Sequence, residues 1–171
     1  LNVEAWFLHV DAGYTIPGPA KMRVSVEFDY ASGDGSGARY GRFDSLFGMR
    51  RGDLAPSGIY NAVTRVNIIT PGLRVEAAPD HRVDFLATYR PMWLANKRDA
   101  FATTGVRDPS GQSGSFAGHQ IEARVRYWLV PNFLRAEVNA IWLARGEFLK
   151  TAPGARSEDT RYLSTGIIAM L

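Results

Sequence analysis

The chain has 171 residues, a net charge of +3, only 22% charged residues and no cysteine. No stretch approaches the ~18 consecutive apolar residues of a transmembrane helix, and the lack of cysteine excludes disulfides and Cys-based metal or redox chemistry. Of the 20 basic residues, all but Lys21, Lys97 and Lys150 are arginine. Because the planar guanidinium matches a carboxylate or phosphate in two hydrogen bonds, this bias indicates an anionic partner.

Apolar and polar residues alternate with a period of two along much of the chain, which predicts strands with one apolar and one polar face. In chain order, the predicted strands are residues 3–14, 20–30, 59–78, 82–90, 121–129, 134–145 and 161–171. Most run roughly 9 to 14 residues, close to the ~9 to 11 that cross a bilayer at a tilt and longer than the ~5 to 6 typical of soluble sheets. No comparable stretch keeps a helical period of 3.6. The alternation predicts an all-β membrane wall.

The connections between these strands alternate in length. Short turns are expected at residues 17–19, 79–81 and 131–132, and long polar loops at 31–57, 97–116 and 147–160. Outer-membrane barrels have short periplasmic turns and long outer loops, so the alternation predicts an antiparallel transmembrane β-barrel with the long loops outside.

Pro71-Gly72 interrupts the predicted strand 59–78, and the polar side changes from odd positions before it to even positions after it. An inserted residue at a β-bulge would explain this change of face, since Pro and Gly are tolerated there. The count is then seven strands. Because single-chain bacterial barrels have an even number, we expect residues 1–171 to be the C-terminal part of one larger barrel domain, with no separate domains.

With the apolar face toward lipid, nine basic side chains fall on the lumen face: Lys21, Arg23, Arg65, Arg74, Arg90, Arg124, Arg126, Arg135 and Arg145. Seven acidic side chains share that face: Asp11, Glu27, Asp29, Glu76, Asp84, Glu122 and Glu137. Two interpretations stay open. The arginines form a ladder that replaces the hydration of passing carboxylates, or they pair across neighbouring strands and hold the wall. Arg124 and Arg126, two residues apart on one face, best fit the ladder.

Other kinds of site find little support in the sequence. His9, His81 and His119 lack the spacing of metal ligands, and no Ser/His/Asp set indicates catalysis. The Gly- and Asp-containing segment 32–37 lacks the regular ligand spacing of a calcium loop, and Arg51-Gly52-Asp53 is a short adhesion-like tripeptide. We therefore expect no catalytic residue, no metal site and no cofactor.

Several long segments resemble the C-terminal part of the alginate export family of outer-membrane porins. They include FDSLFGMRR at 43–51, NIITPGLRVEAAPDHRVD at 67–84, RPMWLANKRDAFATTGVRD at 90–108, GVRDPSGQSGSFAGHQ at 105–120, AGHQIEARVRYWLV at 117–130 and FLKTAP at 148–153. The resemblance covers residues 20–171 and implies a wide monomeric barrel, 18-stranded in the family's characterised member, with an arginine-rich lumen that conducts a polyuronate. The chain departs from the pattern at Leu171, where such barrels usually end in an aromatic residue.

These observations predict an anion-selective bacterial outer-membrane channel, not an enzyme, that passes alginate or a similar polyuronate from periplasm to exterior. The expected partners are the anionic polysaccharide, outer-membrane lipid and periplasmic export components, with no nucleic acid. Two alternatives stay open: an outer-membrane porin for uptake of another anion or oligosaccharide, and a protein of a different class, either a soluble β-sandwich or barrel that binds a ligand or an outer-membrane enzyme.

Overall fold

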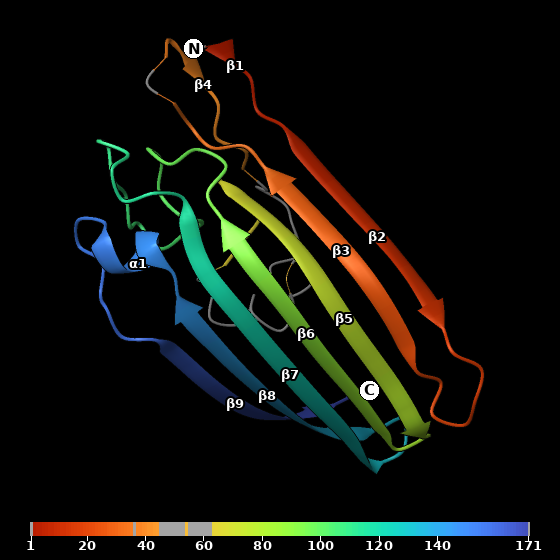
Figure 1. Ribbon diagram of the computed structural model, residues 1–171. Helices are drawn as coiled ribbons and strands as arrows, with labels where there is room; N and C mark the ends of the chain where they lie inside the picture. The colour runs from red at the N-terminus through yellow and green to blue at the C-terminus, as the bar shows by residue number, and fades with distance from the viewer. Residues whose placement is uncertain (1, 36, 45–53, 55–62, 171) are drawn as a thin grey trace.

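Seven antiparallel strands form one sheet in the computed structural model, which describes residues 2–35, 37–44, 54 and 63–170. The order across the sheet is β2, β3, β5, β6, β7, β8, β9, so the chain meanders from one edge to the other (Figure 1). The strands are β2 (Phe7–Thr15), β3 (Arg23–Ala31), β5 (Ile68–Asp80), β6 (Val83–Trp93), β7 (Phe116–Val130), β8 (Leu134–Arg145) and β9 (Thr160–Ala169). The all-β class and the seven antiparallel strands are confirmed.

Three further elements lie in the connections at one end of the sheet. Two short strands, β1 (Asn2–Val3) and β4 (Arg39–Tyr40), form a separate parallel pair. In the described part of the chain there is one helical segment, α1 (Glu147–Thr151), which follows β8 inside a predicted loop. At the other end the connections after β2, β5 and β7 are short, and Lys21 and Asn132 adopt positive φ there, as tight turns require. The predicted alternation of long and short connections is confirmed.

The predicted bulge at Pro71-Gly72 is wrong. The pairing of β3 with β5 keeps one register through both residues, with Phe28 opposite Pro71 and Glu27 opposite Gly72. The irregularity of β5 lies between Ala77 and Asp80, in its pairing with β6. The strand also begins at Ile68, and the described residues 63–67 form bends, so the polar odd positions that suggested a change of face precede the strand. Residues 59–62 lie outside the described residues.

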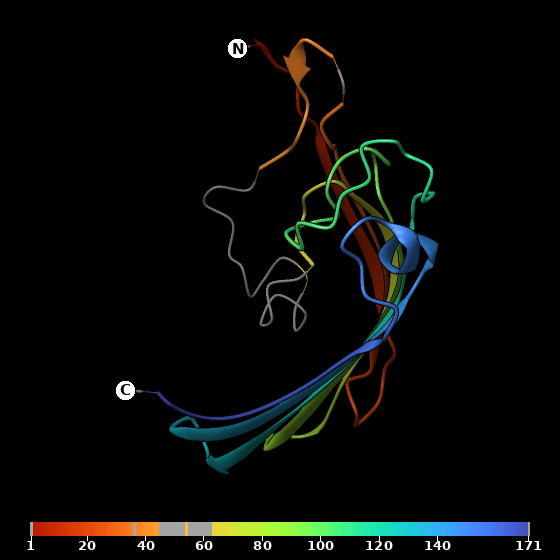
Figure 2. The same cartoon turned by 90° about the vertical axis from the view of Figure 1, so that its left-hand side faces the viewer.

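The two faces of the sheet have opposite character. Figure 2 shows the sheet as a curved wall, with the loops at one end extending over its concave side. On the concave face, charged and polar side chains are buried, including Arg90 at 2% exposure and Glu122 at 0%. On the convex face, large apolar side chains are exposed, including Val26 at 58% and Leu163 at 70%. This is the reverse of a water-soluble sheet and matches a wall with lipid outside and a polar interior.

The apolar core lies at the end of the sheet where the long connections gather. It combines the ends of strands on the concave side with α1 and the loops, through the buried residues Ala31, Leu54, Val63, Ile68, Met92, Leu94, Phe101, Ala102, Ala117, Leu143, Phe148, Leu149 and Ala152. Gly118 of β7 lets the end of β8 approach closely, just before α1. It has φ +142°, and a Cβ there would lie 2.2 Å from the carbonyl oxygen of Ala144, so only glycine fits.

Within the described residues the sheet is open, since β2 and β9 each pair with a single neighbouring strand. The seven described strands therefore do not close into a barrel by themselves. No helix in the described part of the chain is long and apolar enough to cross a membrane.

Candidate functional site

The candidate site is the charged concave face. Seven of the predicted lumen arginines lie in strands, at positions whose parity places them on this face: Arg23, Arg74, Arg90, Arg124, Arg126, Arg135 and Arg145. The other two predicted residues lie outside the strands. Lys21 is exposed in the turn before β3, and Arg65 precedes β5. Arg145 ends β8, where its guanidinium donates to the Arg156 carbonyl and the Thr160 hydroxyl.

Near the loop end, Asp29 of β3 joins two basic side chains. Its carboxylate accepts a hydrogen bond from Arg65 Nε at 2.7 Å and lies 2.9 Å from His9 Nδ1. Asp29 is 1% exposed, and the Arg65 guanidinium stacks on the ring of Phe7 at 5.3 Å from its centroid. Because Arg65 comes from the segment before β5, this cluster ties that segment to β2 and β3.

One residue further along the same face, Glu27 lies between two arginines. Arg74 Nη1 donates to Glu27 Oε1 at 3.1 Å, and Arg90 Nη2 donates to Glu27 Oε2 at 3.2 Å. Arg74 also donates to Glu76 at 2.8 Å. Arg90 Nε lies 3.8 Å from the buried carboxylate of Glu122. These arginines are held by carboxylates of neighbouring strands, as the wall-holding interpretation predicts.

The arginines toward the short-turn end are held less closely. Asp84 Oδ1 accepts a hydrogen bond from Arg126 Nε at 2.7 Å but lies 3.8 Å from Arg124 Nη2. Arg135 lies 4.0 Å from Glu137 and stacks on the ring of Trp128. Arg124 and Arg126 thus share a single carboxylate, and both side chains keep part of their surface accessible, 16% and 26%. This geometry leaves guanidinium donors for a second, external carboxylate.

A cavity of about 360 Å³ opens on the concave face beside the Asp29 and Glu27 clusters. Its walls carry both signs of charge, from His9, Asp11, Arg23, Ser25, Glu27, Leu54, Arg65, Arg74, Glu76 and Arg90. Arg90 Nε and Nη1 have no hydrogen-bond partner among the described residues. Such a cavity suits a ligand that combines hydroxyl and carboxylate groups.

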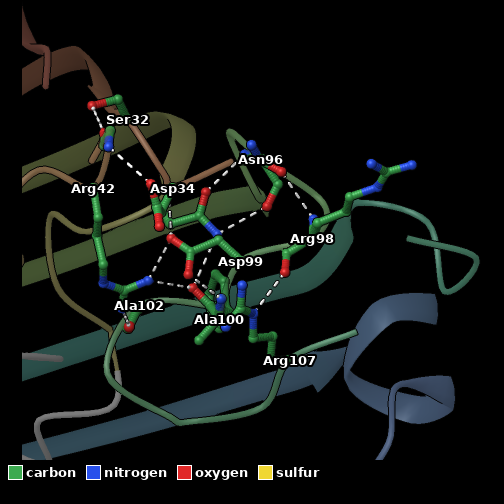
Figure 3. Close-up of polar contacts among 12 residues, drawn as sticks. Ser32, Asp34, Arg42, Asn96, Arg98, Asp99, Ala100, Ala102 and Arg107 are labelled. Carbon is green, nitrogen blue, oxygen red and sulfur yellow. Dashed lines mark hydrogen bonds and ion pairs between the residues drawn. The ribbon is translucent and has the colours of Figure 1, made fainter. Parts of the chain in front are cut away.

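At the loop end, a polar network joins three connections (Figure 3). Asp99 accepts hydrogen bonds from Arg42 Nη1 and from the backbone N–H of Asp34, both at 2.7 Å. The Asn67 amide donates to the carbonyls of Asn96 and Ala100 and accepts from the Asn96 N–H at 2.7 Å. Asn67 is fully buried and has φ +48°. The network holds the connection after β6 against the segments flanking β4 and β5.

Sequence reasoning missed this network because its members are far apart in the chain. Arg42 and Asp99 are 57 positions apart, and neither lies in a strand whose alternation could place it. The pairing of Glu27 with Arg74 and Arg90 could in principle be predicted from the sequence, once the register of the strands is known. The register of β3 and β5 places Glu27 opposite Gly72 and Arg74 opposite Ser25, two residues from Glu27 on the same face.

The metal alternatives can be compared with the structure. Within the described residues, no group of three or more His, Asp or Glu side chains could hold a metal ion. Asp34, the acidic residue of segment 32–37, accepts a hydrogen bond from the backbone N–H of Gly41. Residues 51–53, the adhesion-like tripeptide, lie outside the described residues.

Comparison with protein families gives a match that covers most of the chain. The sequence profile of a family described as "Alginate export" matches residues 2–162, which is most of the chain. No curated protein matches the chain. The family match agrees with an antiparallel sheet whose apolar face is exposed and whose charged face is concave. The chain belongs to the alginate export family.

Proposed function

We propose that this chain forms part of the wall of a channel that passes alginate or a similar polyuronate from the periplasm to the exterior. The family is one of outer-membrane β-barrels that transport polysaccharide, not one of enzymes. The identity of the polymer, its direction and its contacts with the wall are our proposal. Outer-membrane lipid at the convex face and periplasmic export components are the partners that this function requires.

The proposed barrel is larger than the described sheet. In lipid, each unpaired backbone N–H and C=O costs several kcal/mol, so the outer edges of β2 and β9 need partner strands. We propose that further strands of one barrel, about 18 in total, supply them, and that residues 1–171 are its C-terminal part. The long connections then face the exterior and the short turns the periplasm.

The observation that carries the proposal is the arrangement of Arg124, Arg126 and Asp84. Two guanidinium groups share one carboxylate, and the 3.8 Å separation leaves Arg124 weakly paired. A passing uronate carboxylate can bind Arg124 and compete with Asp84 for Arg126. Charge-assisted hydrogen bonds of this kind contribute about 1.5–3 kcal/mol each, which binds one sugar unit without trapping the polymer. The closely paired Arg65, Arg74 and Arg90 mainly hold the wall.

The test is single-channel conductance of the full-length protein in a planar bilayer, with a salt gradient and oligouronate as blocker. Arg124→Ala/Arg126→Ala should lower anion preference and weaken block by on the order of tenfold or more, because at least one charge-assisted contact is lost. Asp84→Asn should change both readouts in the opposite direction, since it frees both arginines.

Cation preference of the wild type without block by the uronate would contradict the function. If the uronate blocks the wild type and neither variant changes that block, the channel function stands, but Arg124 and Arg126 do not determine its selectivity.

One observation favours the second candidate, uptake of a weakly charged oligosaccharide. The lumen arginines are largely matched by carboxylates, so the net charge of this part of the wall is small. Block by a neutral oligosaccharide in place of the uronate would support it.

A further inference from the structure

The connection after β6, residues 94–115, separates its charges by sign. Its two carboxylates are buried and accept hydrogen bonds from neighbouring groups. Asp99, 5% exposed, accepts from Arg42 and from the Asp34 N–H, and Asp108, 3% exposed, accepts from the Ser110 hydroxyl at 2.6 Å and the Ser113 N–H at 2.8 Å. Its three cations, Lys97, Arg98 and Arg107, are exposed. The connection therefore presents only positive charge to solvent.

These three cations are close neighbours. A methyl group added at Gly111 would lie 3.1 Å from Lys97 Cε and 3.2 Å from Arg98 Cγ, so both stems pass over the same residue. Arg107 Nε donates to the backbone carbonyl of Arg98 at 2.8 Å, so the third guanidinium lies against the backbone that carries the other two side chains. No ion pair joins any of the three head groups to a described residue. We call Lys97, Arg98 and Arg107 the basic trio.

Three like charges on one short connection repel one another, and the part of the chain that the structure describes supplies them no ion-pair partner. The backbone that carries it is nonetheless fixed, because Asn67 and Arg42 bind the carbonyls of Asn96, Ala100 and Ala102 in the same connection (Figure 3). A rigid platform that concentrates uncompensated cations suits an anion, since its binding relieves the repulsion and meets pre-positioned donors.

The position of the platform identifies the anion. The connection after β6 lies at the end of the sheet where the long loops gather, and it runs from over the concave side to the rim above the start of β7 (Figure 2). It therefore stands at a mouth of the proposed channel. A lipid phosphate would instead meet side chains at the rim of the convex face. The ligand that reaches this place is the one that uses the channel.

We propose that the basic trio is a second polyuronate site, outside the strand wall, that binds carboxylates of the polymer at the loop-side mouth. This inference rests on the proposed function, because it takes the transported polymer as the ligand. The trio raises the local concentration of the polyanion at the mouth, while Arg124 and Arg126 act inside the wall. Such steering depends on ionic strength and acts on the association rate more than on the lifetime of the bound state.

The test is the rate of block by oligouronate, added to one side or the other of the full-length protein in a bilayer of zwitterionic phosphatidylcholine. The variant is Lys97→Gln/Arg98→Gln; Arg107 stays because its bond to the Arg98 carbonyl holds the loop. The control is Lys150→Gln/Arg156→Gln, which removes two exposed cations from the neighbouring connection, where Glu147, Glu158 and Asp159 offset them. Biotin on a cysteine introduced at the exposed Ser157, with streptavidin, identifies the loop side.

We expect the association rate from the loop side to fall about threefold to tenfold in the variant at low salt, with little change from the other side, in the control, or at 1 M salt. If the variant leaves the association rate from the loop side unchanged, the inference is overturned. Block of the wild type by the oligouronate would still support the proposed function in that case. An equal fall from both sides, or an equal fall in the control, would also overturn it, because the charges would then act through the field of the whole pore. Absence of wild-type block from either side would overturn both.

Discussion

Val125→Arg tests which face of the sheet meets lipid. Val125 lies near the middle of β7, directly opposite Phe85 of β6 and Val138 of β8, and is 40% exposed on the convex face. An arginine at the midplane of a barrel's lipid face costs about 2–4 kcal/mol. At 1.4 kcal/mol per factor of ten, the equilibrium constant for folding into a bilayer falls roughly 30-fold to several hundredfold.

The assay is urea titration of the full-length protein folded into lipid vesicles, with the heat-modifiable gel shift as the folding readout. Arg124→Ala is the control, because it lies one residue away on the concave face and should assemble normally. Its effect should appear in anion preference instead. If both variants fold equally well, the convex face does not meet lipid. If Arg124→Ala alone impairs folding, the two faces are reversed.

Two further predictions concern buried carboxylates. Glu27→Gln should destabilise the folded protein by about 3–5 kcal/mol, because it leaves the buried Arg90 without its nearest carboxylate. Glu76 is a 34% exposed partner of Arg74, so Glu76→Gln should cost less than about 1 kcal/mol. Equal effects of the two variants on the free energy of urea unfolding would contradict this prediction. The Ser110 hydroxyl and the Ser113 N–H lower the pKa of Asp108, so its carboxylate stabilises the connection above about pH 4 and loses this effect as the pH falls through the lowered pKa. Hydrogen exchange at Ser110 and Ser113 should therefore be faster in Asp108→Asn than in wild type from pH 5 to 8, with a difference that shrinks below about pH 4; a difference independent of pH would refute the assignment.

The strand positions and the faces could be predicted from sequence because one physical rule fixes both. In a membrane wall every second side chain meets lipid, so an apolar residue is required at each such position. Residues 134–145 match β8 at both ends, and their alternation fails only at Ile141 and Leu143, which are apolar on the concave face and buried. Alternation weakens where strands extend beyond the lipid. This explains why the predicted strand began at 121, whereas β7 begins at Phe116.

The elements that sequence reasoning missed depend on contacts between distant segments. The bulge was expected at Pro71-Gly72 from a change of polar parity, but Asn67 is polar because it caps the connection after β6, not because it faces the lumen. Likewise, α1 has only 5 residues, too few for a helical period, and is held by burial of Phe148 and Leu149 in the apolar core. Side chains selected for tertiary contacts carry no periodic signal.

The same distinction divides the arginines, which the sequence presents as one set. Arg65, Arg74 and Arg90 lie where carboxylates of β3 approach within about hydrogen-bond distance, and Arg90 is nearly inaccessible. Such groups set the shape and rigidity of the wall, because removing one leaves its partner charge buried. Arg124 and Arg126 have one carboxylate between them, so in the proposed function an incoming carboxylate displaces an internal one at little net cost. A channel that must bind and release each sugar unit needs the second kind of arginine, and the first kind keeps it in place.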